Sequence, residues 1–127
     1  MHRSRLSTFV LDCKSPDLDR AAEFWGRALG RPWRPDADAD PNYRVIESDA
    51  DEPILLVQKV EHQSRIHLDI EADDLEAEAR RLEALGARRV AFVKRWSVME
   101  APTGQRFCIV NPQRGALAKK PRTTEWP

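Results

Sequence analysis

The chain repeats one pattern of strand and helix, and this duplication limits the folds that it can adopt. An apolar stretch at residues 9–13 leads into a helical pattern at 15–30, and residues 66–70 lead in the same order into a second helical pattern at 74–86. Both helical patterns begin near Asp-Leu and end in Leu-Gly. A repeat of this size cannot bury a core alone, so we expect the two halves to pack together or to pair with a second chain.

The composition excludes several classes of partner. The 127 residues include 21 Lys plus Arg and 21 Asp plus Glu, so that the formal net charge is +0. Balanced charge gives no field that attracts nucleic acid or an anionic membrane. No apolar run approaches the roughly 18 residues of a spanning helix, and the apolar stretch after residues 1–5 breaks at Asp12, too soon for a signal-peptide core. We therefore expect a cytoplasmic protein with neither nucleic acid nor membrane as partner.

Each repeat predicts the element order βαβββ. In the first, Ser15 and Pro16 form a helix-start signal, and apolar residues then recur at helical spacing up to Gly30. Its strands are expected near residues 9–13, 32–34, 43–47 and 54–59. The second repeat predicts a helix at 74–85 and strands near 65–70, 89–93, 96–100 and 106–110.

The organisation along the chain follows from these two repeats. We expect a single domain at residues 1–112, with module one at about 6–60 and module two at about 64–112. Residues 113–127 contain several prolines and basic side chains with little periodicity, so a C-terminal surface tail is predicted there.

Several motifs add a family resemblance to this architecture. They are Phe24-Trp25, His67-Leu68-Asp69-Ile70, Leu85-Gly86-Ala87 and the segment 101–108. With the paired βαβββ units, they resemble the glyoxalase-like members of the vicinal oxygen chelate superfamily, over residues about 6 to 112. The resemblance implies an α+β fold in which two tandem βαβββ modules form an open eight-stranded, cup-like sheet with the helices outside.

The resemblance also implies where a metal would bind. Active members of the family hold a divalent metal inside the cup, and their ligand positions correspond here to Thr8, His67 and Cys108, with a further position near Gln58. Threonine hydroxyl and glutamine amide are weak ligands for a transition metal. We therefore expect no resident cofactor; a divalent metal, if bound, would use His67, Cys108 and Gln58.

Strand alternation predicts the polar face of the cup. Arg65, His67 and Asp69 share one face of their strand, whereas Ile66, Leu68 and Ile70 are expected to meet the helices. The predicted ligand-binding residues are Gln58, Arg65, His67, Asp69, Trp96 and Arg106. Three alternatives stay open: His67 belongs to a structural hydrogen-bond network, Trp96 fills the cup as core, and Cys108 is a small buried side chain rather than a reactive thiol.

Three functions are consistent with these residues. The leading hypothesis is a glyoxalase-like protein that binds a small organic molecule of unassigned identity. The alternative is a metal-dependent lyase, isomerase or dioxygenase in which His67 anchors the ion and Glu100 or Asp69 is the catalytic base. A third is a partner-binding subunit whose cup is filled by its own side chains.

We predict a homodimer, because an unpaired sheet edge in so short a chain favours association across a two-fold axis, as the family resemblance also implies. Light scattering should give twice the chain mass of 14.6 kDa. A mass of one chain that does not change with protein concentration would contradict this prediction.

Overall fold

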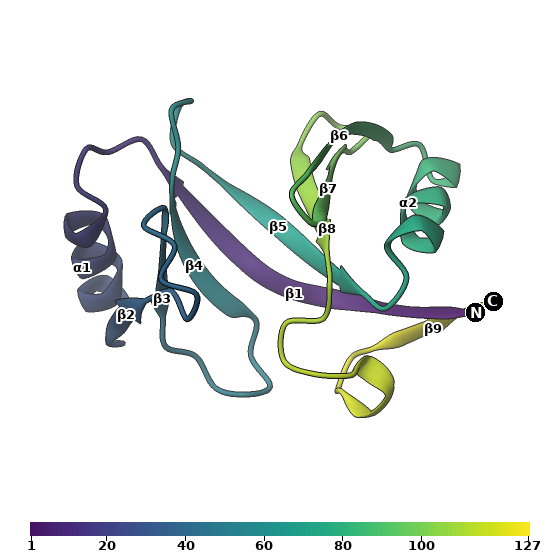
Figure 1. Cartoon of the computed structure of the whole chain (residues 1–127), viewed down its shortest axis with the longest axis horizontal. Helices are drawn as coiled ribbons and strands as arrows, with labels where there is room; N and C mark the ends of the chain where they lie inside the picture. The colour runs from purple at the N-terminus through teal and green to yellow at the C-terminus, as the bar shows by residue number, and fades with distance from the viewer. The chain divides into compact units, whose positions relative to one another are not determined.

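The computed structural model describes all residues from 1 to 127 and contains two α-helices and nine β-strands (Figure 1). The first repeat consists of β1 (His2–Cys13), α1 (Leu18–Leu29), β2 (Trp33–Pro35), β3 (Tyr43–Ile46) and β4 (Ile54–Lys59). The second consists of β5 (Arg65–Ala72), α2 (Leu75–Ala84), β6 (Arg88–Val93), β7 (Trp96–Glu100) and β8 (Arg106–Val110). The α+β class and the duplicated βαβββ order are confirmed. Neither helix has the length and apolar character that crossing a membrane requires.

The chain folds as two compact units, residues 8–67 and residues 1–7 with 68–127. In the first unit the strand order is β2-β3-β4-β1, with β1 parallel to β4 and the other pairs antiparallel. Helix α1 packs on one face of these strands, where Leu18 meets Leu11, Ile46 and Val57. These apolar residues form the core of the unit.

Helix α1 begins later than the sequence predicts. Its N-cap is Asp17, whose carboxylate accepts a hydrogen bond from the backbone N–H of Arg20. The hydroxyl of Ser15 instead accepts from the backbone N–H of Asp17, in the turn before the helix. The predicted start at Ser15 is therefore wrong, because the Asp17 carboxylate, and not the Ser15 hydroxyl, accepts from an unpaired N–H of the first helical turn. The end at Gly30 is confirmed, with φ at 69°.

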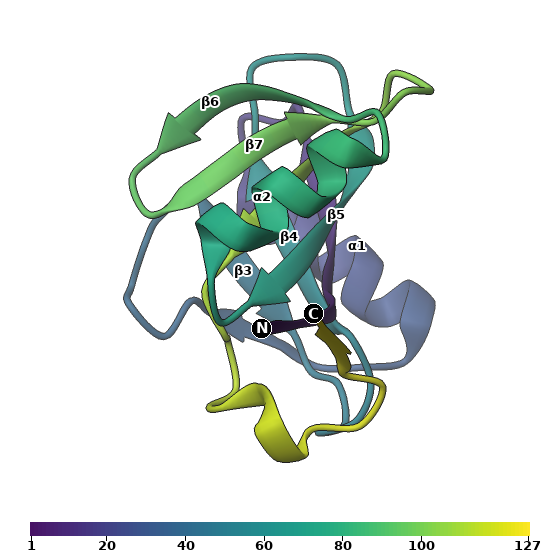
Figure 2. The same ribbon diagram turned by 90° about the vertical axis from the view of Figure 1, so that its right-hand side faces the viewer.

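The second unit repeats this arrangement with the order β5-β8-β7-β6, and β5 runs parallel to β8. Helix α2 lies beside β6 and β7 (Figure 2). Its Ala79 packs with Ala72, Met99 and Ile109. Asp74 is the N-cap, close to the predicted start of this helix.

The predicted environment of two β5 residues is wrong. Ile66 is 62% exposed and Leu68 is 41% exposed, although both were expected to meet the helices. Alternation places Leu68 on the same face as Ala72. Helix α2 covers that face only where β5 ends, at Ala72, and leaves its beginning uncovered.

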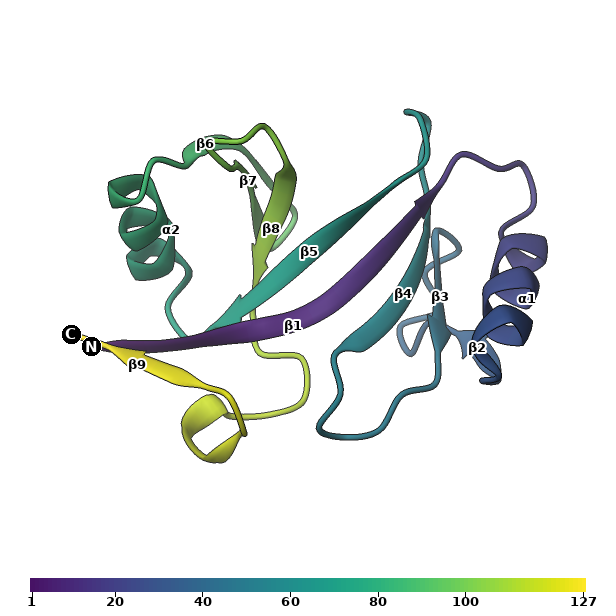
Figure 3. The same ribbon diagram turned by 180° about the vertical axis from the view of Figure 1, so that it is seen from behind.

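Residues 113–127 are structured, unlike the surface tail that their composition predicts. They contain a 3₁₀ turn at Leu117–Lys119 and a ninth strand, β9 (Thr124–Trp126). β9 pairs antiparallel with the start of β1, so that both chain termini lie at the same end of this unit (Figure 3). Leu117 is buried. The pairing depends on β1 extending back to His2, well before the expected strand start at residue 9.

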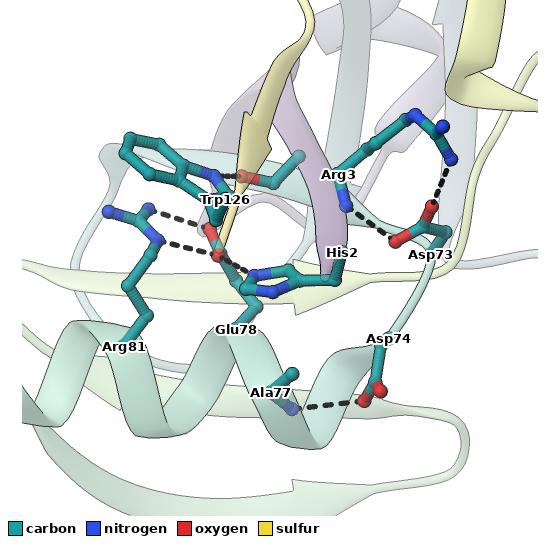
Figure 4. Close-up of polar contacts among 9 residues, drawn as sticks. His2, Arg3, Asp73, Asp74, Ala77, Glu78, Arg81 and Trp126 are labelled. Carbon is teal, nitrogen blue, oxygen red and sulfur yellow. Dashed lines mark hydrogen bonds and ion pairs between the residues drawn. The ribbon is translucent and has the colours of Figure 1, made fainter.

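Polar contacts join β9 and β1 to helix α2 (Figure 4). The indole N–H of Trp126 donates to the hydroxyl of Ser4 at 2.9 Å, and the Arg81 guanidinium lies 3.8 Å above the indole ring. Glu78 is fully buried and accepts hydrogen bonds from Arg81 and from Nε2 of His2, each at 2.8 Å. Both ends of the chain thus contact helix α2, His2 through Glu78 and Trp126 through Arg81, and Glu78 accepts a hydrogen bond from Arg81.

We predict that Glu78 makes this protein sensitive to acid. Burial raises the pKa of Glu78, but hydrogen bonds from Arg81, His2 and Ser4 outweigh it, and the pKa falls below its ordinary value of 4.5. A lowered pKa in the folded state stabilises the protein above pH 4.5, and this stability is lost as the pH falls through the folded-state value. Glu78→Gln should lower the free energy of unfolding at neutral pH by roughly 1–3 kcal/mol and flatten its decline in acid.

Urea melts between neutral pH and about pH 3 would measure both effects. Glu125→Gln is the matched control, because the Glu125 carboxylate is 45% exposed and pairs with Arg3 at the surface. Equal acid slopes for the wild type and Glu78→Gln would show that Glu78 does not carry the effect.

Candidate functional site

The candidate site begins with the alternation of side chains along β1. Leu11 and Cys13 contact the core beneath α1. Val10 and Asp12 therefore point to the opposite face of the sheet. Burial raises the pKa of the Cys13 thiol, and the neighbouring Asp12 raises it further, so this cysteine is a poor nucleophile. The candidate site residues of this unit therefore lie on the face opposite α1.

Two rows of paired residues cross that face. The polar row contains Tyr43, Gln58 and Asp12, and the apolar row contains Val45, Leu56 and Val10. The side-chain amide of Gln58 donates to the hydroxyl of Tyr43 at 3.0 Å. An apolar surface beside a few oriented polar groups is typical of sites for small organic molecules.

The polar row is joined to β5 by a hydrogen bond between Asp12 and His67. Nδ1 of His67 lies 2.8 Å from Oδ2 of Asp12, which is only 3% exposed. An ionised carboxylate only accepts, so Nδ1–H of His67 is the donor. This hydrogen bond fixes the orientation of the imidazole ring.

Two more basic side chains approach the same carboxylate. Nε of Arg65 lies 3.7 Å from Oδ2 of Asp12, and Nε2 of His62 lies 4.0 Å from it. The other oxygen, Oδ1, is buried and accepts no hydrogen bond from the protein. Asp12 is therefore a buried carboxylate that three basic residues approach from one side.

In the other unit, the face opposite α2 contains several predicted site residues. Met99 and Ile109 belong to the core under α2, so the alternate residues Trp96, Glu100 and Cys108 point the other way. Nζ of Lys94 lies 5.9 Å from the centre of the Trp96 ring. Asp69 pairs in register with Cys108 across β5 and β8.

Glu100 lies between two arginines. Its carboxylate accepts hydrogen bonds from Nε of Arg88 and, at 3.4 Å, from Nε of Arg106. The hydrogen bond from Arg88 is the main reason why the pKa of Glu100 lies below its ordinary value. A carboxylate of lowered pKa is a weaker base. The two arginines therefore make Glu100 less basic than an isolated glutamate.

Asp69 and Cys108 bring two metal-binding side chains together within one unit, because they are register partners on β5 and β8. Carboxylate and thiolate are both firm ligands for a transition metal such as zinc. Gln58, which the sequence predicts as a ligand, is instead hydrogen-bonded through its amide to Tyr43.

Three residues of the site were not predicted from the sequence as partners. Asp12 accepts the hydrogen bond from His67, and no local pattern pairs these two residues. Tyr43 was overlooked, although it is the only tyrosine of the chain and its register with Gln58 follows from the antiparallel pairing of β3 and β4. His62 lies in the loop before β5, and no pattern in the sequence brings it to Asp12.

Comparisons with known proteins agree with this architecture. A family model described as a glyoxalase-like domain matches residues 8–110. A methylmalonyl-CoA epimerase from Mycobacterium tuberculosis aligns with a TM-score of 0.59 and 20% identity, over 85% of this chain and 87% of the epimerase. No curated protein matches the chain.

Two further solved structures share the fold. A hypothetical protein from Bacillus halodurans C-125 aligns with a TM-score of 0.59 and 10% identity, over 89% of this chain and 97% of that protein. An extradiol ring-cleaving dioxygenase from B. fuscum aligns with a TM-score of 0.55 and 18% identity, over 87% of this chain and 34% of the dioxygenase. This chain thus spans about a third of the dioxygenase. At these identities the likeness is one of fold.

We predict that Zn²⁺ added to the purified protein distinguishes the two ligand sets. Asp69→Asn and Cys108→Ser should each weaken Zn²⁺ binding by at least about tenfold, because each removes a charged ligand. Gln58→Ala is the control and should bind as the wild type does. Calorimetric titration measures all four proteins. Loss of binding in Gln58→Ala with retention in Asp69→Asn would restore the sequence-based ligand set. A wild type that binds no zinc would contradict a zinc site at Asp69 and Cys108 and would agree with the expectation from the sequence that no metal is resident.

Proposed function

Because the chain belongs to the glyoxalase-like domain family, we propose that it binds a small organic molecule on the sheet face that carries Asp12 and His67. The polar row that ends at Asp12 would orient the molecule. The half-buried Val45 and Leu56 would contribute apolar contact.

The hydrogen bond from His67 to Asp12 carries this proposal. It fixes the direction of the imidazole ring. An imidazole held in this way would orient a polar group of a ligand beside the apolar residues of the same face.

A metal-dependent lyase, isomerase or dioxygenase is the second candidate, favoured by the register pair of Asp69 and Cys108 on β5 and β8. A divalent metal would supply Lewis-acid chemistry, in which a substrate oxygen is polarised. His67 would then present Nε2 as ligand while Asp12 keeps its ring in place. Asp69 would act as ligand in this case, rather than as the base expected from the sequence.

We also propose that the chain works as a homodimer in the cytoplasm. The exposed Ile66 and Leu68 support the association, because large apolar side chains on a strand are normally covered. The light-scattering measurement given above tests it.

We predict that two substitutions of His67 separate binding from folding. His67→Gln keeps an N–H that can donate to Asp12, so its free energy of unfolding should stay within about 1 kcal/mol of the wild type. His67→Ala leaves Asp12 without this donor and should cost roughly 1–3 kcal/mol. Both variants remove the imidazole, so both should weaken ligand binding.

The ligand for this test is the strongest binder in a thermal-shift screen of small organic acids, aldehydes and phenols. Urea melts give the stability, and calorimetric titration gives the affinity, which we expect to fall about tenfold in each variant. If His67→Gln bound the compound as tightly as the wild type, His67 would be part of the scaffold and the proposed site would be misplaced.

A further inference from the structure

Arg65 differs from the other paired arginines of its unit. Arg31, Arg34 and Arg44 each donate a hydrogen bond to a carboxylate at 2.7–2.8 Å. Arg65 instead approaches Asp12 through Nε at 3.7 Å, and its guanidinium donates no hydrogen bond within the chain. Its side chain is 49% exposed.

The Asp12 carboxylate already accepts a hydrogen bond from His67. The hydrogen bond from His67 is 2.8 Å long, and a hydrogen bond of that length to a buried carboxylate is far stronger than an ion pair at 3.7 Å. The terminal nitrogens of Arg65 therefore remain available to a second anion. A guanidinium presents these nitrogens as a planar fork, which matches the two oxygens of a carboxylate.

The position of Arg65 relates such an anion to the proposed site. Arg65 and His67 are two residues apart on β5, so their side chains share a face at a separation of about 6.6 Å along the strand. A molecule of a few carbon atoms spans this distance. Its carboxylate would lie on Arg65 while the rest of the molecule extends along the same face toward His67.

We propose that Arg65 is a specificity-determining residue that binds the carboxylate of a small organic acid. This inference rests on the proposed function, since it names the class of molecule that the Asp12–His67 face takes. A carboxylate fits better than a phosphate, because a single guanidinium matches one negative charge, and His62 is the only other basic group that the structure places at Asp12 outside the hydrogen bond.

The test uses three probes that share one ring: benzoate, benzamide and phenyl phosphate. Binding to the full chain is followed by NMR titration, with the resonances of the Asp12–His67 face as the readout. Arg65→Gln removes the charge and keeps a polar side chain. Arg34→Gln is the matched control, because the Arg34 side chain is 50% exposed and pairs with Glu47 on the same unit. Thermal melts check that both variants fold.

We expect the wild type to bind benzoate at least about tenfold more tightly than benzamide and than phenyl phosphate. Arg65→Gln should abolish this preference and leave benzamide binding unchanged, whereas Arg34→Gln should change neither. Equal binding of benzoate and benzamide at the face would overturn the role of Arg65 and leave the proposed function standing. A preference for phenyl phosphate would overturn the carboxylate assignment. If no probe shifted the face, both the proposed function and this inference would fail.

Discussion

The burial of the Asp12 carboxylate is the constraint on which the candidate site depends. Removing a charge from water costs several kcal/mol unless hydrogen bonds or opposite charges compensate it. Asp12 is 3% exposed, and its compensation comes from His67, Arg65 and His62, all approaching Oδ2. The position of His67 follows from the need to compensate the buried charge of Asp12. Attraction to the same charge holds Arg65 near the carboxylate through Nε, and the terminal nitrogens of Arg65 are not used.

Buried carboxylates in the other unit are compensated differently. Glu71 and Glu78 are each paired with an arginine, Arg5 and Arg81 respectively, through direct hydrogen bonds. Glu71 also accepts from the backbone N–H of Gln113 at 2.9 Å, which anchors the segment after β8. Since these carboxylates bind neighbouring segments of the chain, their role is structural. Asp12 differs, because no arginine donates a hydrogen bond to it: its hydrogen-bonded partner is the imidazole of His67, and Arg65 approaches only to 3.7 Å.

The secondary structure was largely predictable from local patterns. Period-two alternation placed β7 and β8, and apolar residues at helical spacing placed α1 and α2. The errors arose where a choice depended on distant residues. Ser15 and Asp17 both suit an N-cap, and the sequence does not rank them. Strand β1 starts at His2 because β9 pairs with it, and no local signal announces a partner more than 100 residues away.

The sequence predicted which strand face some residues of the site occupy, but not which residues they contact. Alternation set Gln58 apart from Val57, which packs under α1, because side-chain direction is a property of each strand alone. It also set His67 apart from Ile66 and Leu68, although these two residues are exposed. It could not give the hydrogen bond from His67 to Asp12, nor the approach of His62 and Arg65, because these depend on which strands become neighbours.

The features that this sequence determines by itself are therefore the periodic ones: the duplicated βαβββ order, the apolar stripes of the helices and the two faces of each strand. These follow from backbone geometry, which acts between residues a few positions apart. Pairing of strands, coverage by helices and compensation of buried charge were decided only in the folded chain. Ile66 is exposed and Asp12 is buried. Hydrophobicity alone predicts the opposite for both residues, because it takes no account of how distant segments pack.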